Sequence, residues 1–347
     1  MSRRRLLVTG GAGFIGSHFI RAWLARHPSD DVIALDALTY AGSRARLAEA
    51  ERTGRCRFLQ GDICEPEAVR EAMRGAQAVV HCAAETHVDR SITDAAPFLR
   101  TNVEGTYTLL REALACGVDR FLHISTDEVY GPVLEGAVDE SAPLAPRSPY
   151  AASKAAGDLL VQAVRATHQL PAIVVRPTNV FGPWQFPEKF IPLCITNGMA
   201  GVPLPLYGDG RQRRSWLYVD DLSGALEVML EQGRPGEVYN VAGGQEQSNL
   251  ETATTILAQT GGPDGLIQFV ADRPGHDRRY AMTDGKLRAL GWQPAVPFER
   301  GLAQTIAWYR GHDDWWRPLA QHLREDPYHW LNRPARADAA RASGAAA

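Results

Sequence analysis

Two residues with complementary acid–base chemistry lie four positions apart in the chain. Tyr150 and Lys154 both fall in the segment 148–154, and Pro149 stands directly before the tyrosine. Proline favours the first turn of a helix, and side chains four positions apart share a helix face, so both can point into one cleft. A nearby ammonium stabilises a phenolate, so Lys154 would lower the pKa of Tyr150 and make it a usable base near neutral pH. The alternative is an ordinary pair on a solvated helix surface.

A hydroxyl and two carboxylates stand together in Thr126, Asp127 and Glu128, directly after the apolar segment 120–125. This segment is typical of a strand, and ligands of open parallel sheets bind beyond the carboxyl ends of the strands. Two adjacent carboxylates are more than the oxidation of an alcohol requires. They suit an acid and a base that act on neighbouring carbons. A polar turn that caps the strand is the alternative interpretation.

A glycine-rich turn follows the first predicted strand and opens the first predicted helix. Gly10, Gly11, Gly13 and Gly16 fit both G-x-G-x-x-G and the shifted G-x-x-G-x-x-G. Without a Cβ the backbone can approach a pyrophosphate, whose charge then lies on amide N–H groups at a helix N-terminus. A tight strand-to-helix turn without a ligand would also use glycines, so the motif needs a second signal.

That second signal is an aspartate at the end of the next predicted strand. Asp36 follows Gly16 by 20 residues, where a carboxylate can accept hydrogen bonds from the adenosine ribose. The same carboxylate would repel a 2′-phosphate, so the sequence favours NAD over NADP. Asp62, after the third predicted strand, is a candidate adenine contact, although a turn aspartate is an equally good interpretation.

The elements that position these residues alternate between short β-branched runs and longer helical patterns. We predict strands over 5–9, 31–36, 57–60, 78–82, 120–125 and 172–176, and helices over 15–27, 66–74, 103–115 and 151–167. Repeated βα units of this size predict an α/β fold, a Rossmann-type doubly wound parallel sheet covered on both faces. Prolines and glycines crowd the segment 177–210. We therefore expect an NAD-binding domain over 1–177, with later segments returning to it, a smaller substrate domain over 178–333, and a disordered tail over 334–347.

The composition excludes several other classes of protein. The 347 residues carry 37 basic and 40 acidic side chains, a formal charge of −3, which argues against a nucleic-acid partner. No apolar run approaches the roughly 18 residues of a membrane span, and the basic start is followed by only three apolar residues, so we expect no signal peptide. The five cysteines are scattered and lack C-x-x-C spacing, which predicts reduced thiols in a cytoplasmic protein and no metal site.

With these residues in place, the sequence resembles the dTDP-glucose 4,6-dehydratase family of the extended short-chain dehydrogenase/reductases. The resemblance runs from about residue 5 to residue 309, and its specific marks are the segments 83–91, 125–131, 182–189 and 272–280. The threonine–aspartate–glutamate run separates these dehydratases from the sister epimerases and decarboxylases, which lack the acid–base pair. The resemblance implies the cofactor NAD, a nucleotide-diphosphate sugar as substrate, and a homodimer formed through two helices, here 101–116 and 150–166.

The family mechanism implies a role for each of the five candidate catalytic residues. Tyr150, assisted by Lys154 and Thr126, would deprotonate the sugar 4-hydroxyl while C4 gives hydride to NAD. The resulting ketone acidifies the C5 proton, which Glu128 would remove while Asp127 protonates the departing 6-hydroxyl. The hydride then returns to C6, so that NAD is regenerated in every turnover.

The resemblance also implies two sets of binding residues. The cofactor set comprises Gly10, Gly13, Phe14, Ile15, Gly16, Asp36, Leu38, Thr39, Asp62, Ile63, Ala83, Ala84, Thr101, Tyr150 and Lys154. The substrate set comprises Thr86, Thr126, Asn179, Lys189, Phe190, Pro205, Tyr207, Arg214, Asn249, Arg273 and His276. Guanidinium groups suit a diphosphate because they offer several fixed donors.

The chain departs from the family pattern at a few positions near the expected nucleotide and sugar. Val180 stands where the family has a second asparagine, Leu222 where it often has histidine, and Thr86 in place of serine. The catalytic groups are intact, whereas the choice among dTDP-, UDP- and GDP-linked sugars stays open. A 4-epimerase or decarboxylase with the same tyrosine and lysine, and a catalytically silent NAD-binding regulator, are the remaining alternatives.

Overall fold

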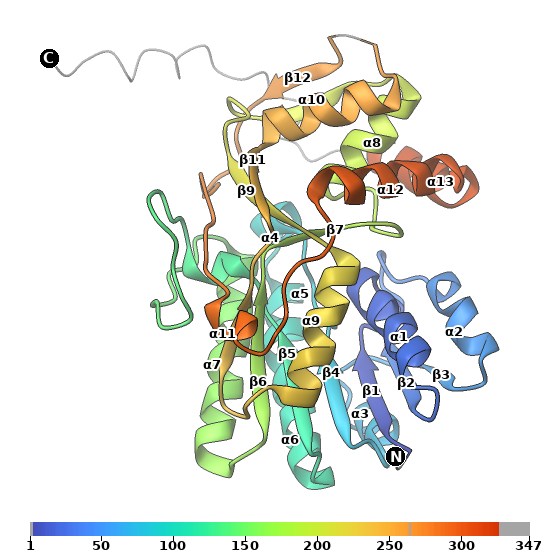
Figure 1. Ribbon diagram of the computed structural model, residues 1–347, viewed down its shortest axis with the longest axis vertical. Coiled ribbons are helices and arrows are strands. Elements are labelled where there is room, and N and C mark those ends of the chain that lie inside the picture. The colour runs from blue at the N-terminus through green and yellow to red at the C-terminus, as the bar shows by residue number, and fades with distance from the viewer. Residues whose placement is uncertain (1–2, 264, 326–347) are drawn as a thin grey trace, which may run out of the picture.

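The computed structural model describes residues 3–263 and 265–325, and a large parallel sheet forms its centre (Figure 1). Within these residues the largest sheet has seven strands in the order β10-β6-β5-β4-β1-β2-β3, every pair of them parallel. The strands are β1 (Arg5–Thr9), β2 (Asp31–Asp36), β3 (Cys56–Gln60), β4 (Ala78–His81), β5 (Arg120–Ile124), β6 (Ala172–Pro177) and β10 (Val238–Val241).

Helices cover both faces of this sheet because successive side chains of a strand point to opposite faces. Leu6 and Val8 of β1 pack in the core that includes α1 and α9, whereas Leu7 packs in the core that includes α3, α6 and α7. The doubly wound α/β fold predicted from the sequence is confirmed. The covering helices are α1 (Phe14–Arg26), α9 (Val219–Gln232), α3 (Pro66–Met73), α6 (Thr106–Cys116) and α7 (Pro149–His168).

The predicted strands agree with β1 to β6 to within one residue at each end, but one helix differs from its prediction. A single helix was expected over 103–115. The structure instead has a π-helical turn, η2 (Arg100–Gly105), before α6, and two short helices precede it, α4 (Val88–Thr93) and α5 (Ala96–Leu99). A wide turn of this kind is frequent at functional sites. Two short elements, η1 (Arg44–Leu47) and α2 (Ala48–Arg52), follow β2.

A second group of elements lies at the carboxyl ends of the strands, above the large sheet in Figure 1. It has its own core around Phe181, Trp216, Leu302 and Trp316. Its strands are β7 (Asn179–Phe181), β8 (Leu204–Tyr207), β9 (Arg213–Tyr218), β11 (Gln245–Ser248) and β12 (Ile267–Val270), and its helices are α8 (Phe190–Ala200), α10 (Asn249–Thr260), α12 (Phe298–Arg310) and α13 (Asp313–Glu325). The short helix α11 (Gly285–Arg288) lies beside β10.

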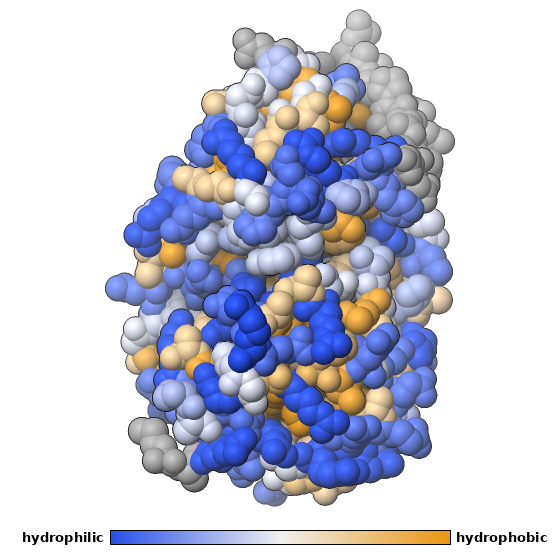
Figure 2. Space-filling view, turned by 90° about the vertical axis from the view of Figure 1, so that its right-hand side faces the viewer, coloured by the Kyte–Doolittle hydropathy of each residue, from blue (hydrophilic) through white to orange (hydrophobic). Residues whose placement is uncertain are grey.

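The chain beyond residue 177 also returns to the large sheet. β10 pairs with β6, and α9 packs against α1, so the segment 219–241 belongs to the large sheet layer. The tail predicted over 334–347 lies outside the described residues. None of the helices in the described part of the chain combines the length and the apolar character that a membrane-crossing helix needs. The face in Figure 2 is largely hydrophilic, with small hydrophobic areas between the charged side chains.

The topology creates a crevice above the middle of the sheet. The strand order reverses between β1 and β4, so the loops that follow these two strands leave in opposite directions. Ligands of open α/β sheets bind at such a switch point, outside the carboxyl ends of the strands. Gly10 follows β1 and Ala83 follows β4, so a ligand is expected to bind between the loops that contain these two residues.

Candidate active site

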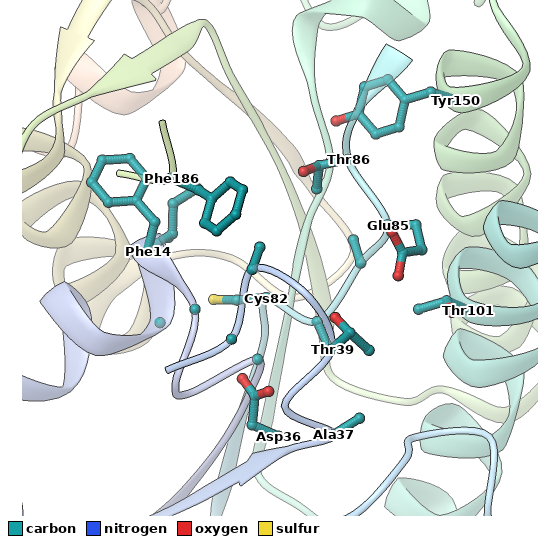
Figure 3. A pocket seen from close by; sticks show the side chains of 18 of the residues that line it. Phe14, Asp36, Ala37, Thr39, Cys82, Glu85, Thr86, Thr101, Tyr150 and Phe186 are labelled. Carbon is teal, nitrogen blue, oxygen red and sulfur yellow. The ribbon is translucent and has the colours of Figure 1, made fainter. Parts of the chain in front are cut away.

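A cavity of about 980 Å³ opens at this switch point. Its walls come from the loops after β1, β2, β3, β4 and β5, from η2 and α7, and from the segment 177–189. In Figure 3, Asp36 and Tyr150 lie toward opposite ends of the drawn part of the pocket. Most of the predicted site residues line the cavity: Gly10, Gly13, Phe14, Ile15, Gly16, Asp36, Thr39, Asp62, Ile63, Ala83, Ala84, Thr86, Thr101, Thr126, Glu128, Tyr150, Asn179 and Lys189.

The glycine turn is too tightly packed for any side chain. Gly10 has a φ of +64°, and a Cβ there would lie 2.7 Å from the backbone nitrogen of Ala83. A Cβ at Gly16 would overlap the carbonyl group of Gly10, with the carbonyl carbon only 2.9 Å away. The first turn of α1 begins after Gly13 without a side-chain cap, so its amide groups are directed at the cavity that Gly13, Phe14 and Gly16 line. This geometry is that of an anion site at a helix N-terminus.

Asp36 both closes its own turn and faces the cavity. Its carboxylate accepts hydrogen bonds from the backbone N–H groups of Ala12 (2.9 Å) and Leu38 (2.8 Å). Burial raises the pKa of Asp36, while these two N–H groups act in the opposite direction. A carboxylate has about four lone-pair sites, so Asp36 keeps acceptor capacity for a diol. Leu38, a predicted cofactor residue, is absent from the lining and acts here through its backbone.

Arg46 is a charged residue of the cavity wall that was not predicted from the sequence. It lines the cavity next to Asp36, is 1% exposed, and donates hydrogen bonds to the carbonyl oxygens of Ala12, Ala41 and Trp184. Burial lowers its pKa to about 10. Because its guanidinium is already directed at carbonyl groups, it is not placed to receive a 2′-phosphate. One arginine among many in the sequence gives no signal of such a role.

Thr126, Asp127 and Glu128 form the strand end that the sequence predicts. Thr126 is the N-cap of the short helix η3 (Asp127–Tyr130), and its hydroxyl accepts a hydrogen bond from the backbone N–H of Glu128 (3.3 Å). The same hydroxyl donates to Oδ1 of Asp127 (3.2 Å). Thr126 and Glu128 line the cavity, whereas Asp127 lies behind them, only 3% exposed. The polar capping turn considered as an alternative is therefore present, and Thr126 and Glu128 of this turn also face the cavity.

Burial gives these two carboxyl groups unusual proton affinities. The pKa of Asp127 is raised to about 7, first by burial and then by the neighbouring Glu128 carboxylate. Burial also raises the pKa of Glu128, but the cations Arg273, Arg214 and Lys189 counteract it. Asp127 can therefore hold a proton near neutral pH, while the cations around Glu128 favour its charged form, and an acid–base pair needs this division of labour.

Tyr150 and Lys154 both lie on α7, as their spacing predicts, but only Tyr150 lines the cavity, and the electrostatics of the pair differ from the prediction. Ser148 caps α7 through the N–H of Ala151, Pro149 occupies its first turn, and both Tyr150 and Lys154 are buried. Burial raises the pKa of Tyr150, and Glu128 raises it further, while the hydrogen bond with Thr126 lowers it.

The tyrosine pKa is therefore raised and not lowered, contrary to the expectation from Lys154. Lys154 Nζ donates to the carbonyl oxygen of Ile124 (2.6 Å), and burial lowers the lysine pKa to about 8. Lys154 does not line the cavity either. The physical reason is the depth of the site, where burial disfavours the charged forms of both partners.

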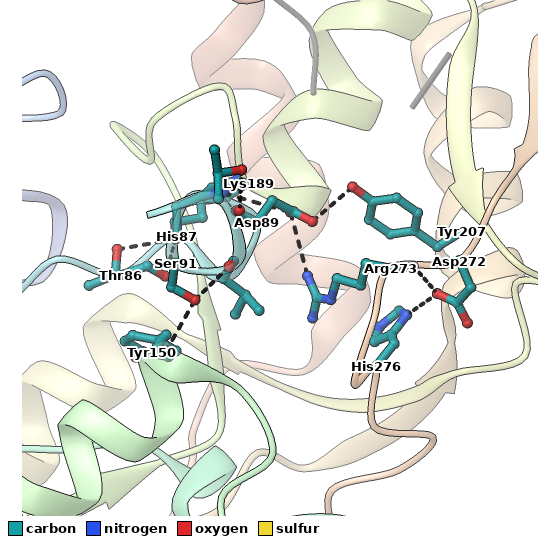
Figure 4. Close-up of polar contacts among 12 residues, drawn as sticks. Thr86, His87, Asp89, Ser91, Tyr150, Lys189, Tyr207, Asp272, Arg273 and His276 are labelled. Carbon is teal, nitrogen blue, oxygen red and sulfur yellow. Dashed lines mark hydrogen bonds and ion pairs between the residues drawn. The ribbon is translucent and has the colours of Figure 1, made fainter. Parts of the chain in front are cut away.

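A second cluster joins the helix α4 to the upper elements through Asp89 (Figure 4). Oδ1 of Asp89 accepts a hydrogen bond from the hydroxyl of Tyr207 (3.1 Å), and its Oδ2 lies 3.6 Å from Nη1 of Arg273. Arg214 contacts His276 (3.1 Å between Nη2 and Nε2), and His276 packs edge-on against Tyr207. The structure thus brings four predicted substrate residues together from β8, β9 and the segment 271–280.

Three further predicted substrate residues lie outside the cavity lining. Phe190 stacks on Trp216 at 6.2 Å between ring centroids, Pro205 belongs to β8, and Asn249 begins α10. Among the described residues, the buried polar atoms without a hydrogen-bond partner include Asn179 Oδ1, Asn249 Oδ1 and Arg273 Nε. Buried polar atoms normally have a partner, so these atoms indicate a polar ligand at this place.

Two other residues of the site were not predicted as site residues. Asn102, on η2, donates to the carbonyl oxygen of Glu85 (3.0 Å) and to the hydroxyl of Ser153 (2.9 Å), so it fixes the loop after β4 against α7. Its signal was a polar residue inside an apolar helical pattern. Tyr280 reaches Glu128 Oε2 (3.4 Å) and Asp277 Oδ2 (3.0 Å) with its hydroxyl, at the end of the segment 272–280.

Comparison with known proteins gives relatives over most of the chain. Residues 6–242 match the NAD dependent epimerase/dehydratase family. A dTDP-glucose 4,6-dehydratase of Streptomyces niveus is 51% identical over 91% of this chain and 95% of its own length. The low-salt glycan biosynthesis protein Agl12 of Haloferax volcanii is 52% identical over 89% of this chain and 99% of its own length.

Solved structures agree over the same extent. The crystal structure of DesIV, a dTDP-glucose 4,6-dehydratase from Streptomyces venezuelae with NAD bound, is 50% identical and covers 91% of this chain and 99% of that one, with a TM-score of 0.89. A UDP-glucose 4-epimerase from Thermus thermophilus in complex with NAD is 32% identical over 89% of this chain and 99% of that one, with a TM-score of 0.83. Because a dehydratase and an epimerase both match the fold, the residues of the site must distinguish the two reactions.

Proposed function

This chain belongs to the NAD dependent epimerase/dehydratase family, and on that premise we propose that it is an NAD-dependent NDP-glucose 4,6-dehydratase, a hydro-lyase that converts dTDP-glucose into dTDP-4-keto-6-deoxyglucose. The resemblance to the dTDP-glucose 4,6-dehydratases is confirmed by relatives at 51% and 50% identity over nine-tenths of the chain. The observation that carries the choice of reaction is the acid–base pair Asp127 and Glu128, beside Tyr150 at the end of β5.

The cavity fits NAD. The first turn of α1 and the side-chain-free glycine turn offer amide groups to a pyrophosphate, and Asp36 offers acceptors to a ribose diol. The guanidinium of Arg46, next to Asp36, is directed at backbone carbonyl groups and not at the place of a 2′-phosphate, which supports NAD over NADP. When bound, NAD supplies a hydride acceptor that takes the hydrogen of C4 and later returns it to C6.

The side chains around the sugar divide the proton transfers among themselves. Tyr150 removes the proton of the 4-hydroxyl, and Thr126 holds the tyrosine through a hydrogen bond that lowers its pKa. A ketone at C4 makes the C5 proton acidic, so Glu128 can remove it. Asp127, whose raised pKa of about 7 leaves a large share of it protonated near neutral pH, donates a proton to the 6-hydroxyl as it leaves as water. Glu128 then returns its proton to C5.

The upper elements hold the nucleotide diphosphate in this proposal. Arg214 is buried and Arg273 is partly buried at the upper end of the site, and Lys189 and Asn179 line the cavity. Arg273 keeps one buried donor nitrogen without a partner among the described residues, which suits an anionic oxygen. We infer a division of labour in which residues 1–177, with β10 and α9, hold NAD, and the rest of 178–333 holds the nucleotide sugar.

We further propose a cytoplasmic homodimer. The helices α6 and α7 lie side by side on one face of the large sheet, and each exposes a large apolar side chain, Tyr107 (51% exposed) and Leu159 (58% exposed). Exposed large apolar side chains on two adjacent helices support an interface at this face. Leu159→Glu should therefore shift the protein to the monomer in light scattering, whereas an unchanged mass would place the interface elsewhere.

The rival function is 4-epimerisation, which needs Tyr150 and NAD but no acid–base pair. The decisive experiment incubates the protein with the dTDP-, UDP-, GDP- and CDP-linked forms of glucose and analyses the products by mass spectrometry. We expect a product lighter by one water, formed best from dTDP-glucose, and none with Tyr150→Phe. A product of unchanged mass would support the epimerase instead.

A further inference from the structure

A buried carboxylate, Asp89, lies beside the cations expected to hold the nucleotide diphosphate, and the proposed reaction gives it no task. Asp89 belongs to the short helix α4 and is 5% exposed. Its negative charge would repel a diphosphate, so direct contact with that ligand does not account for its place. A buried carboxylate is costly unless it is paired, which makes its partners informative. This inference rests on the proposed function and concerns how the same site orients its ligand.

Each oxygen of Asp89 has a partner in the upper elements. Oδ1 accepts a hydrogen bond from the hydroxyl of Tyr207 (3.1 Å), and Oδ2 lies 3.6 Å from Nη1 of Arg273 (Figure 4). Oδ2 also lies 3.7 Å from Nδ1 of His87, but burial, assisted by Lys189 and Arg273, lowers the pKa of this histidine well below its ordinary value. His87 is therefore neutral near pH 7, and Arg273 is the charged partner among these three.

Asp89 contacts one side of the Arg273 guanidinium and leaves another side for a ligand. Nη1 stands on the side of Cδ, whereas Nε and Nη2 form a separate edge that can bind an oxyanion through two parallel hydrogen bonds. Nε of Arg273 is buried and has no hydrogen-bond partner among the described residues. A buried N–H normally has an acceptor, so this edge indicates an anionic oxygen of a ligand. Asp89 at Nη1 orients the guanidinium without competing for that edge.

Asp89 is itself held in place by the elements around it. The ring of Tyr207, whose hydroxyl donates to Asp89, has its centroid 5.8 Å from Cζ of Arg273. On the same short helix, Ser91 accepts a hydrogen bond from the backbone N–H of Tyr150 (3.1 Å). The helix α4 thus connects Arg273 with the first turn of α7, which carries the tyrosine expected to act on the sugar.

We propose that Asp89 is a positioning residue, which holds the guanidinium of Arg273 so that its Nε edge meets the diphosphate of the nucleotide sugar. Burial opposes a charge at Arg273, but Asp89 and then Glu128 favour it, and the pKa of Arg273 is raised. Asp89 acts on the ligand in two opposite ways. Its charge repels the diphosphate, whereas its contact with Arg273 orients a guanidinium toward it. The two effects predict changes of opposite sign in ligand affinity when the charge of Asp89 is removed.

The test is a double-mutant cycle on the dissociation constant of dTDP, measured by calorimetry with NAD present. Asp89→Asn removes the charge but keeps an acceptor oxygen for Tyr207, and it is combined with Arg273→Gln. We expect Asp89→Asn alone to weaken dTDP binding about tenfold, because Arg273 then loses a charge-assisted hydrogen bond to the diphosphate. In the Arg273→Gln background, the same change should leave the dissociation constant within about twofold or tighten the binding.

Two other outcomes would overturn the positioning role. If Asp89→Asn binds dTDP as tightly as the wild type or more tightly, repulsion outweighs positioning. If it weakens dTDP binding equally in both backgrounds, Asp89 acts through the fold and not through Arg273. Asp119→Asn, at an exposed position, is the matched control and should bind dTDP as the wild type does. Asp89→Ser, which is also uncharged, gives the same readout if the asparagine variant does not fold. Failure of the proposed function is distinguishable, because the wild type itself would then bind no dTDP, and this inference would fall with it.

Discussion

At the scale of single residues, two neighbouring carboxyl groups acquire different proton affinities from their surroundings. Burial and the Glu128 charge raise the pKa of Asp127 to about 7, although Arg214 and the hydrogen bond from Thr126 act in the opposite direction. Glu128 is equally buried, but Arg273, Arg214 and Lys189 favour its charged form. Two groups of almost the same chemistry can therefore act as acid and base in one reaction.

The first prediction concerns the pH dependence that follows from Asp127. A general acid must carry its proton, so activity is present below its pKa and is lost as the pH rises through it. We expect kcat/KM, which reports the free enzyme, to fall about tenfold per pH unit on an alkaline limb that begins near pH 7. A rate that stays flat between about pH 6 and pH 9 would contradict the assignment of Asp127 as the acid.

The second prediction separates oxidation from elimination at Glu128. Glu128→Gln removes the base for the C5 proton but leaves Tyr150 and the cofactor site in place. Formation of the dehydrated product should slow by about 10²–10⁴-fold, and deuterium from the solvent should no longer enter C5 in NMR spectra. Glu67→Gln, at an exposed position on α3, is the matched control and should behave as the wild type. Undiminished product from Glu128→Gln would refute this role.

The third prediction concerns cofactor choice at Asp36. Because this carboxylate also accepts from the N–H groups of Ala12 and Leu38, Asp36→Asn is a cleaner change than alanine, since it keeps an acceptor oxygen and removes the charge. We expect the ratio of NAD to NADP affinity to fall by ten- to a hundredfold, about 1.4 kcal/mol per tenfold step. Calorimetry on the apo forms, with the exposed Asp119→Asn as control, measures it. An unchanged ratio of NAD to NADP affinity would show that Asp36 only stabilises its turn and does not select the cofactor.

At the scale of elements, the glycine turn after β1 shows why the cofactor loop tolerates no side chain. Gly16→Ala would place a Cβ against the carbonyl group of Gly10 inside the first turn of α1, where backbone cannot move aside cheaply. We expect a loss of about 1–3 kcal/mol of stability and weaker NAD binding. Gly285→Ala, at an exposed position with open space for a Cβ, is the control.

Thermal unfolding with and without NAD measures both effects of Gly16→Ala. The control should be neutral or slightly stabilising, because alanine favours a helix more than glycine does. A Gly16→Ala variant with wild-type affinity for NAD would contradict the packing described for this turn.

The elements differ in how well the sequence predicts them. The large sheet can be predicted because its buried strands are short apolar runs between clear helical patterns. The start of α7 can be predicted because Pro149 marks it. The π-helical turn η2 cannot be predicted, because its local sequence pattern does not differ from that of an α-helix. Its Asn102 acquires a role only by meeting Glu85 and Ser153, which lie far away in sequence.

The same reasoning explains which site residues could be predicted. The glycine turn, Asp36 and the Thr126–Glu128 run are local motifs, and most of their residues line the cavity. The predicted substrate residues Tyr207, Arg214, Arg273 and His276 come from β8, β9 and the segment 271–280. Because they are far apart in sequence, only the resemblance to a family indicated that they belong to one site. Local sequence patterns do not show how deeply the site is buried. They therefore could not predict the raised pKa of Tyr150 or the hydrogen bond from Lys154 to the carbonyl oxygen of Ile124.

At the scale of the whole molecule, the active site lies where two groups of elements meet. The large sheet contributes the glycine turn, the acid–base residues and Tyr150, and the upper elements contribute Arg214, Arg273 and Tyr207. Asp89 connects the two groups through its contacts with Tyr207 and Arg273. In the proposed function, NAD and the nucleotide sugar therefore meet at the carboxyl ends of the strands of the large sheet.

The central claim is that hydrogen leaves C4 of the sugar and returns to C6 of the same molecule as water is lost. The most direct test is incubation with dTDP-glucose that carries deuterium at C4, followed by NMR and mass spectrometry of the product. Our account predicts a product lighter by one water with deuterium at C6. Deuterium found again at C4 of a sugar of unchanged mass, or lost from the sugar altogether, would contradict it.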